Sequence, residues 1–545
     1  MRVALTFLLA LWLAGCTTTL PLASEGPSSK SLKRDYYQVR IETHDGKKLA
    51  ATVYQPKLTA GQSAPLVIAT HGFGGFRAKR PLSIYGQTMI TGEAALAAWK
   101  KGYWVVFYDQ RGWGQSQGKV HMMDPDYEIR DLSTVIDWSL AHLPGVKRLD
   151  NGEPAIGMIG ESYGGGLQTL SSFTEPRLQA LVPIASWHDL NSLAPNRHMK
   201  TNWGAILLIP GGISSGFDIG FMFKKPLRSG FGGTLSHDGV DLLYARSPAS
   251  FCDAGKQPQA DALFVQGFRD TLFPVQEALK NQQCFTDAGR DARVLAIQGG
   301  HILPWPVQSW SGKPLFNTEK EITCGDYQGT LVDTIVSWWD EKLKGEDALA
   351  PTLCMTVGYK DGLADRQAPT IKEVFPVSRN RIQIPFAGSG EWLGIPGDIL
   401  GDMFRSLWPG ADLRFLKPQG GIVRPRFIPL HIANENEVLA GIPEINLQVG
   451  GTASKVSTRL FIGVGVQHAN RRRVKVASEQ LTPLPRKGFF NQELPAVSVK
   501  LKAGDRVGLV VYGYTWQYFF NPSFWWSQAE ISGQAALPII EVPEQ

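Results

Sequence analysis

Short, predominantly apolar runs recur along the first part of the chain and alternate with segments of helical period. They lie at residues 65–70, 103–108, 155–160, 178–185, 262–267 and 293–298. A strand without a polar face is buried on both sides, and the helices between such strands supply the covering layers. The pattern predicts an α/β fold with a parallel sheet, opened by a β-hairpin within residues 36–54.

This alternation of apolar runs and helical segments is interrupted twice along the chain. Residues 188–250 are rich in aromatic residues and glycines without a clean strand, so we expect an inserted cap over the carboxyl ends of the strands. After a helix-like segment at 331–345, strands with alternating polar and apolar positions take over. A chain of 545 residues exceeds the size of one hydrophobic core. We therefore expect an α/β domain at 34–350 and a β-sandwich domain at 351–545.

The first residues have the pattern of an export signal. Met-Arg is followed by an apolar stretch too short to span a bilayer, and the stretch ends in LAGC. This ending resembles the lipobox of bacterial lipoproteins, which implies a signal at 1–16, lipidation of Cys16 and a flexible tether at 17–33. We expect an exported lipoprotein, anchored in a bacterial membrane and facing the periplasm or the cell surface. The alternative is an ordinary cleaved signal with a chance cysteine.

The net charge and the cysteine content limit which partners, disulfides and cofactors are expected. The net charge of +6 is small for this length, so nucleic acid is not an expected partner. Four cysteines follow Cys16, and export favours two disulfides, of which sequential pairing is the simplest: Cys252–Cys284 and Cys324–Cys354. Free buried thiols are the alternative. The cysteines lack the spacing of a zinc site, so we expect neither a metal nor another cofactor.

The candidate catalytic residues are a serine, an aspartate and a histidine. GESYGGG at 160–166 fits the GxSxG nucleophile elbow, in which a serine, here Ser162, is exposed at a sharp turn from strand to helix. Serine needs a base and a carboxylate that orients the base. Asp270 and His301 each follow an apolar strand, in the chain order of the α/β-hydrolases. Asp270 as a helix cap and His301 as an ordinary loop residue are the alternatives.

An acyl-transfer site also needs donors for the oxyanion. One is expected from the backbone amide of Tyr163, the residue after the serine. The second candidate is the amide of Phe73 or Gly74, in the loop THGFGGF (70–76), which resembles the HG loop of α/β-hydrolases; a tight turn without a catalytic part is the alternative. DQRGWGQSQG (109–118) resembles a DxRGxGxS loop and is expected to support the site.

Taken together, these motifs and the β-rich C-terminal half resemble the X-Pro dipeptidyl-peptidase and cocaine-esterase-like family of serine hydrolases. The resemblance implies an α/β-hydrolase domain with a cap, followed by a jelly-roll domain. Two departures weaken any transfer of substrate. Esterase members place a tyrosine hydroxyl in the oxyanion hole, where this chain has Phe73, and a tryptophan that often precedes the β domain is missing from residues 359–369.

Three functions remain to be compared. The favoured one is hydrolysis of acyl esters, with a small-molecule substrate and no membrane contact beyond the N-terminal lipid. The alternative is an X-Pro dipeptidyl-peptidase, which needs a carboxylate for the amine of its peptide substrate; residues 188–250 contain no Glu. The third is a binding protein with an inert hydrolase half, against which the intact Ser-Asp-His set argues. The sequence does not specify the oligomeric state.

Overall fold

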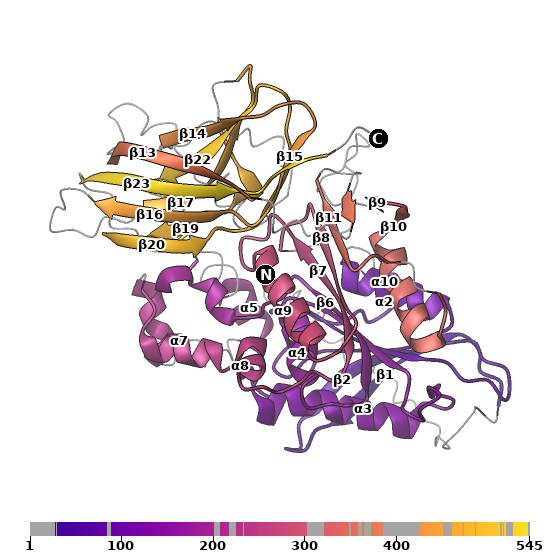
Figure 1. The fold of residues 1–545 in the computed structure, drawn as a ribbon. Coiled ribbons are helices and arrows are strands. Elements are labelled where there is room, and N and C mark those ends of the chain that lie inside the picture. Colours follow the sequence, from indigo (N-terminus) through magenta and orange to yellow (C-terminus); the bar gives the residue numbers. More distant parts are fainter. Residues whose placement is uncertain are drawn as a thin grey trace, which may run out of the picture.

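The computed structural model shows an α/β body with a β-sandwich beside it (Figure 1). It describes residues 28, 30–83, 89–200, 208–216, 225–232, 234–301, 321–347, 350–357, 362–364, 372–384, 426–450, 460–471, 474–484, 487–512, 515, 517–518 and 527–542.

A ten-stranded sheet forms the α/β body, in the order β1-β2-β4-β3-β5-β6-β7-β8-β11-β12. The strands are β1 (Asp35–Glu42), β2 (Lys48–Gln55), β3 (Leu66–Thr70), β4 (Trp104–Tyr108), β5 (Ile156–Glu161), β6 (Leu178–Ile184), β7 (Asp261–Gly267), β8 (Ala292–Ile297), β11 (Leu353–Thr356) and β12 (Gly362–Ala364). All pairs from β4 to β11 are parallel, while β1, β2 and β12 pair antiparallel. The predicted apolar runs and the opening hairpin are confirmed.

Helices cover both faces of this sheet, as the sequence pattern predicts. Alternate residues of each strand enter different cores: Leu66 and Ile68 face one cluster, and Val67 and Ala69 face the other. The first cluster includes residues of α3 (Arg130–His142), α4 (Tyr163–Ser171) and α9 (Val275–Asp287). The second includes α2 (Ile90–Lys100) and α10 (Leu331–Trp339). A parallel strand packed on both faces explains why apolar residues dominate these runs.

The insertion between β6 and β7 contains several short helices among its described residues. Its helices are η3 (Leu190–Leu193), η4 (Pro195–Arg197), α5 (Leu208–Ser214), α6 (Lys225–Arg228), η7 (Ser229–Gly232), α7 (His237–Tyr244) and α8 (Pro248–Asp253). Several contacts fix it to the α/β body, two of which lie near the loops after β3 and β4. Gly211 of α5 lies against Gly74, and Arg246 forms an ion pair with Asp124.

The C-terminal part is a β-sandwich. One sheet holds β13 (Glu373–Ile384), β23 (Ser527–Leu537), β16 (Glu444–Gly450) and β20 (Gly488–Glu493). The facing sheet holds β14 (Arg426–Ile432), β22 (Arg506–Tyr512), β17 (Leu460–Gln467), β18 (Lys475–Val476) and β19 (Thr482–Leu484), and a smaller sheet holds β21 (Val497–Lys500), β15 (Glu437–Gly441) and β24 (Ile539–Glu541). Leu447 of β16 and Leu509 of β22 belong to one core, so the sheets enclose a common interior.

The expected boundary between residues 350 and 351 is wrong. Strand β11 pairs in parallel with β8, and β12 pairs with β11, so the first sheet extends to Ala364. The sandwich begins with β13 at Glu373. The reason is that β11 follows α10 as one more strand-after-helix unit, and only four residues carry its apolar signal. Within the described ranges, no helix combines the length and the apolar character needed to cross a bilayer.

Candidate active site

Ser162 lies at a sharp turn between β5 and α4. Its backbone has φ 50° and ψ −110°, a conformation that costs a residue with a side chain about 1–3 kcal/mol. Glycines make the turn possible. A Cβ at Gly160 would lie 2.7 Å from the carbonyl carbon of Gly164, and one at Gly164 would lie 3.0 Å from the carbonyl oxygen of His71. The strained backbone holds the serine side chain out of the strand at the start of α4.

His301 connects Ser162 with Asp270. Its Nε2 lies 2.9 Å from Oγ of Ser162, and its Nδ1 lies 2.9 Å from Oδ2 of Asp270. The three residues come from the ends of β5, β7 and β8, which are neighbours in the parallel sheet apart from the intervening β6. The ring of Phe273 contacts the imidazole edge to face, with ring centres 5.4 Å apart. The structure thus brings together the three side chains that the sequence motifs single out.

The carboxylate of Asp270 is fully buried and fixed by its own loop. Oδ1 accepts hydrogen bonds from the amides of Leu272, at 2.8 Å, and Phe273, at 3.0 Å. Oδ2 accepts from Nε2 of Gln266 at 2.8 Å and faces His301. Asp270 is not the cap of α9, because the N-cap residue is Pro274. The contacts fix the plane of the carboxylate toward the imidazole.

The expected oxyanion donors lie beside Ser162. Tyr163 is the first residue of α4, and the first amides of a helix have no acceptor within it. The loop after β3 packs on the serine, since a Cβ at Gly72 would lie 3.4 Å from Cβ of Ser162. Phe73 and Gly74 follow directly. The Phe73 ring makes edge contacts with Tyr163, at 5.5 Å, and Trp113, at 4.7 Å, so it packs within an aromatic cluster.

The DQRGWGQSQG loop (109–118) packs against the loop after β3 and fixes it through Asp109. Asp109 accepts from the amide of Arg77 at 2.6 Å and from that of Gln115 at 2.8 Å, and it forms a buried ion pair with the Arg77 guanidinium. Burial lowers the pKa of His71, and its neutral ring accepts from the amide of Gln110 through Nε2. Sequence reasoning missed Arg77, because nothing in its neighbourhood distinguishes it from a surface arginine.

Glu128 is a second buried group that the sequence did not reveal. Its carboxyl accepts from the amides of His121, at 2.6 Å, and Asp124, at 3.0 Å, and the Tyr163 hydroxyl donates to it at 3.3 Å. Burial raises the pKa of Glu128 to about 7. It therefore holds the side chain of Tyr163, the residue that follows Ser162.

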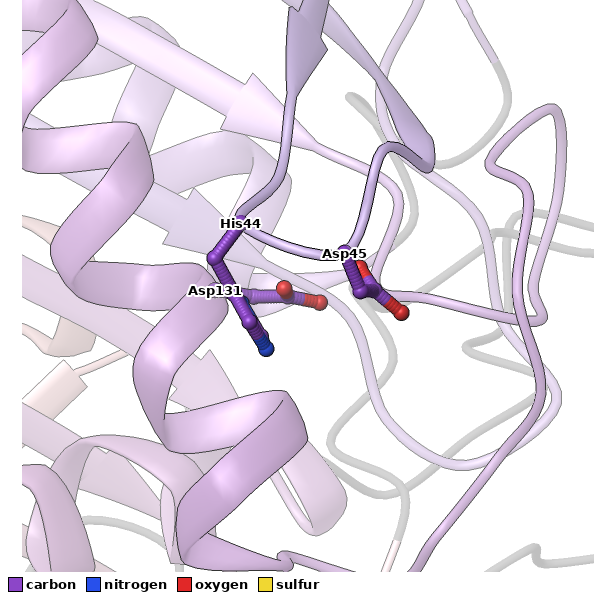
Figure 2. A group of neighbouring side chains, drawn as sticks. All are labelled: His44, Asp45 and Asp131. Carbon is purple, nitrogen blue, oxygen red and sulfur yellow. The ribbon is translucent and has the colours of Figure 1, made fainter.

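One group of potential metal ligands lies away from the serine. His44 and Asp45, in the β1–β2 turn, approach Asp131 on α3, with ligand atoms within 4.8 Å of one another (Figure 2). The Arg111 guanidinium bonds both carboxylates, at 2.7 Å to Asp131 and 3.2 Å to Asp45. A cation of the chain itself thus compensates these charges, and the group serves as a structural link between the hairpin and α3.

The cysteines form the two pairs that sequential order favours. The disulfide Cys252–Cys284 joins α8 of the insertion to α9. Cys324–Cys354 joins β9 (Glu321–Cys324), which pairs with β10 (Tyr327–Thr330), to β11. Cys16 lies outside the described residues.

Comparison with known proteins finds a family match within the N-terminal part. Residues 45–205 match the family described as X-Pro dipeptidyl-peptidase (S15 family). An uncharacterised protein of Pseudomonas aeruginosa is 27% identical over 153 residues, 28% of this chain and 37% of the relative. The quorum-quenching protein AidA of Acinetobacter baumannii is 26% identical over 165 residues, 30% of this chain and 48% of AidA. The matches thus span less than half of these relatives.

Solved structures match over nearly the whole chain. A CocE/NonD family hydrolase from Staphylococcus aureus has a TM-score of 0.61 at 13% identity, covering 97% of this chain and 99% of the other. An aminopeptidase from a marine sediment Thaumarchaeota archaeon has a TM-score of 0.60 at 14% sequence identity, and the match covers 95% of this chain and 99% of the aminopeptidase. An α-amino acid ester hydrolase has a TM-score of 0.57 at 14% sequence identity, and the match covers 97% of this chain and 100% of the ester hydrolase. At this identity the likeness concerns the fold: an α/β-hydrolase domain followed by a β-sandwich.

Proposed function

We propose that this chain, whose residues 45–205 match the X-Pro dipeptidyl-peptidase (S15) family, is a serine hydrolase that cleaves acyl esters through Ser162, His301 and Asp270. The observation that carries the proposal is the pair of contacts at His301, with Nε2 2.9 Å from the serine hydroxyl and Nδ1 2.9 Å from the carboxylate. A serine becomes a nucleophile when a neighbouring base removes its proton, and this arrangement supplies the base and the group that orients it.

In the first step, Oγ of Ser162 attacks the ester carbonyl carbon while Nε2 of His301 takes the hydroxyl proton. Asp270 holds the other ring nitrogen protonated, which leaves Nε2 free to accept. The negative charge that develops on the carbonyl oxygen is met by the Tyr163 amide and by the amide of Phe73 or Gly74. Each such donor contributes about 3 kcal/mol to stabilisation of the transition state.

Collapse of the tetrahedral intermediate breaks the bond to the alcohol, which leaves with the proton from His301. A water molecule then attacks the acyl-enzyme as His301 removes its proton, and a second collapse returns the proton to Ser162. The products are a carboxylic acid and an alcohol, and the enzyme is restored.

Esters are favoured over peptides with a free N-terminus because the described part of the insertion offers few anchors for an amine. Asp189 accepts a hydrogen bond from the amide of Asn191 at 2.9 Å and so caps its own turn. Asp238 and Asp241 are exposed on α7. The buried Glu277 already accepts from the amides of His188 and Asp189. A peptidase of the X-Pro type would need a carboxylate that remains available to the substrate.

The test is a parallel rate assay on residues 17–545 with short p-nitrophenyl esters and with Ala-Pro-p-nitroanilide. Ser162→Ala is the test variant. Ser250→Ala is the matched control, because within the described residues that hydroxyl donates to the carbonyl of Ser247, the N-cap residue of α8. Ester turnover that falls at least about 10⁴-fold in Ser162→Ala and persists in Ser250→Ala is expected. Faster turnover of the Ala-Pro amide would make the chain a dipeptidyl-peptidase.

We also propose that Cys16 carries the lipid that attaches the protein to a bacterial membrane, facing the periplasm or the cell surface. The support is the short apolar stretch that ends in LAGC. In a bacterial host the full chain should incorporate an alkyne-tagged fatty acid and fractionate with membranes, and Cys16→Ala should do neither. Membrane attachment of Cys16→Ala without label would contradict the proposal.

A further inference from the structure

Lys200 is a buried cation beside the loop that carries Asp270. Its side chain is 6% exposed, and its Nζ donates to the carbonyl oxygen of Leu272 at 2.8 Å. A charged ammonium loses much of its hydration in such a place, so it is retained only where its contacts compensate. None of the roles assigned above uses this residue.

The carbonyl that Lys200 binds belongs to the same peptide group as the amide that binds Asp270. The Leu272 carbonyl and the Phe273 N–H are the two ends of one peptide unit, and that N–H donates to Oδ1 of Asp270 at 3.0 Å. A cation on the oxygen side polarises the peptide and strengthens donation from its nitrogen. Lys200, the 272–273 peptide and Asp270 therefore form a chain of hydrogen bonds that ends at the carboxylate facing His301.

Lys200 is also the point where three parts of the fold meet. It lies in the insertion, where its amide donates to the carbonyl of Leu193, and it forms an isolated β-bridge with Tyr518 of the sandwich. The buried Tyr518 donates to the carbonyl of Leu481. The neighbouring Gln480 donates through Nε2 to the carbonyl of Phe268, at the start of the Asp270 loop. The insertion and the sandwich thus hold the loop from two sides.

We propose that Lys200 is a positioning residue for the hydrolytic reaction, which acts through the Leu272–Phe273 peptide to hold the Asp270 carboxylate against His301. The inference rests on the proposed function of these two residues. It assigns to the contact between the insertion and the sandwich a part in catalysis, because the lysine that joins them also orders the loop of the acid.

The surroundings of Lys200 predict how this effect depends on pH. Among the described residues, the charged groups that act on Lys200 are Asp270 in the loop and Glu277 on α9, and its backbone pairs with that of Tyr518 in the sandwich. Burial lowers the pKa of Lys200 to about 8, against the opposing charges of the two carboxylates. Burial raises the pKa of Glu277 to about 7 and that of Tyr518 well above its ordinary value. Lys200 is thus charged at neutral pH and loses its proton just above.

The experiment compares pH profiles of kcat/KM on a p-nitrophenyl ester for the wild type, Lys200→Met and Lys200→Gln. Methionine removes the charge and the donor, whereas glutamine retains a neutral donor for the Leu272 carbonyl. Lys147→Met is the matched control, because Lys147 also donates from Nζ to a backbone carbonyl, that of Lys344, away from the serine. Ser162→Ala is measured in parallel, so that failure of the proposed function is separate from failure of this inference.

The wild-type profile should fall to a lower level through an inflection near pH 8, as Lys200 becomes neutral. At pH 7, Lys200→Met should lose about tenfold or more in kcat with KM changed by less than about threefold, and Lys200→Gln should lose less. Both variants should lack the inflection, and the acidic limb of their profiles should move to higher pH because a nearby positive charge is gone. Lys147→Met should behave like the wild type.

Two results would overturn the inference. One is a Lys200→Met or Lys200→Gln protein with the wild-type profile and kcat and only a lower melting temperature, which is the signature of a packing role. The other needs no variant: a wild-type profile without an inflection near pH 8, in a protein whose activity depends on Ser162.

Discussion

Nε2 of His301 lies 2.9 Å from Oγ of Ser162, although 139 residues separate the two along the chain. The sheet explains the contact. Ser162 follows β5 and His301 follows β8, and the carboxyl ends of parallel strands meet at one edge of a sheet. A strained elbow on one side and a buried carboxylate on the other then fix the two side chains in a productive orientation.

Replacement of Asp270 by asparagine should reduce kcat by about 10³- to 10⁴-fold, because an amide nitrogen in place of Oδ2 favours the wrong tautomer of His301. The measurement is ester turnover at saturating substrate. Circular dichroism and thermal unfolding show whether the fold is retained. A folded Asp270→Asn protein with more than about a tenth of the wild-type kcat would contradict the role of the carboxylate.

Asp109→Asn should destabilise the protein by about 3–5 kcal/mol, because it leaves the buried Arg77 guanidinium without its counter-ion. The loop after β3, which carries the proposed second oxyanion amide, should loosen at the same time, so kcat should also fall. Urea unfolding and ester turnover measure the two effects. Asp137→Asn is the control, since its ion pair with Arg177 is largely exposed and should contribute under about 1 kcal/mol. Equal losses in both variants would contradict the assignment.

The buried Glu128 should make the protein less stable as the pH rises. Its pKa is raised by burial from the ordinary value of 4.5 to about 7, so the folded state holds a proton that the unfolded state releases. The resulting stabilisation is fully present below pH 4.5 and is lost as the pH rises through 7, by up to about 3 kcal/mol. Glu277 contributes with the same sign.

Glu128→Gln stays uncharged, so its unfolding free energy should decrease less between pH 4.5 and 7 than that of the wild type. Urea titrations at a series of pH values measure this difference. Glu153→Gln, an exposed change in the turn before β5, is the matched control and should leave the slope as in the wild type. A Glu128→Gln slope equal to the wild-type slope would show that Glu128 is ionised in the folded protein at neutral pH.

The α/β sheet and the Ser-Asp-His set could be predicted because each leaves a local signal. A strand buried on both faces, such as β3, is almost entirely apolar, and the elbow requires glycine at 160 and 164 in a fixed relation to the serine. The residues that position the catalytic groups leave no such local signal in the sequence. Arg77, Glu128 and Lys200 are charged residues whose burial depends on partners distant in the chain, at Asp109, Tyr163 and Leu272.

The position at which the first sheet ends could not be predicted from the sequence for a related reason. β11 has four residues, and its place beside β8 depends on a pairing across nearly sixty positions. The period-two pattern of the sandwich begins soon afterwards, so the two regions merge in the sequence. Long-range pairing is set by the completed core and has no local period of its own.

The central claim, that Ser162 is the nucleophile, is tested most directly by covalent labelling. A fluorophosphonate probe reacts with an activated serine hydroxyl and loses fluoride, and the adduct is located by mass spectrometry of peptides. We expect a single adduct on the peptide that contains Ser162, present in the wild type and in Ser250→Ala and absent from Ser162→Ala. A folded wild-type protein that takes no label, or a Ser162→Ala protein that is labelled as fast as the wild type, would contradict the account.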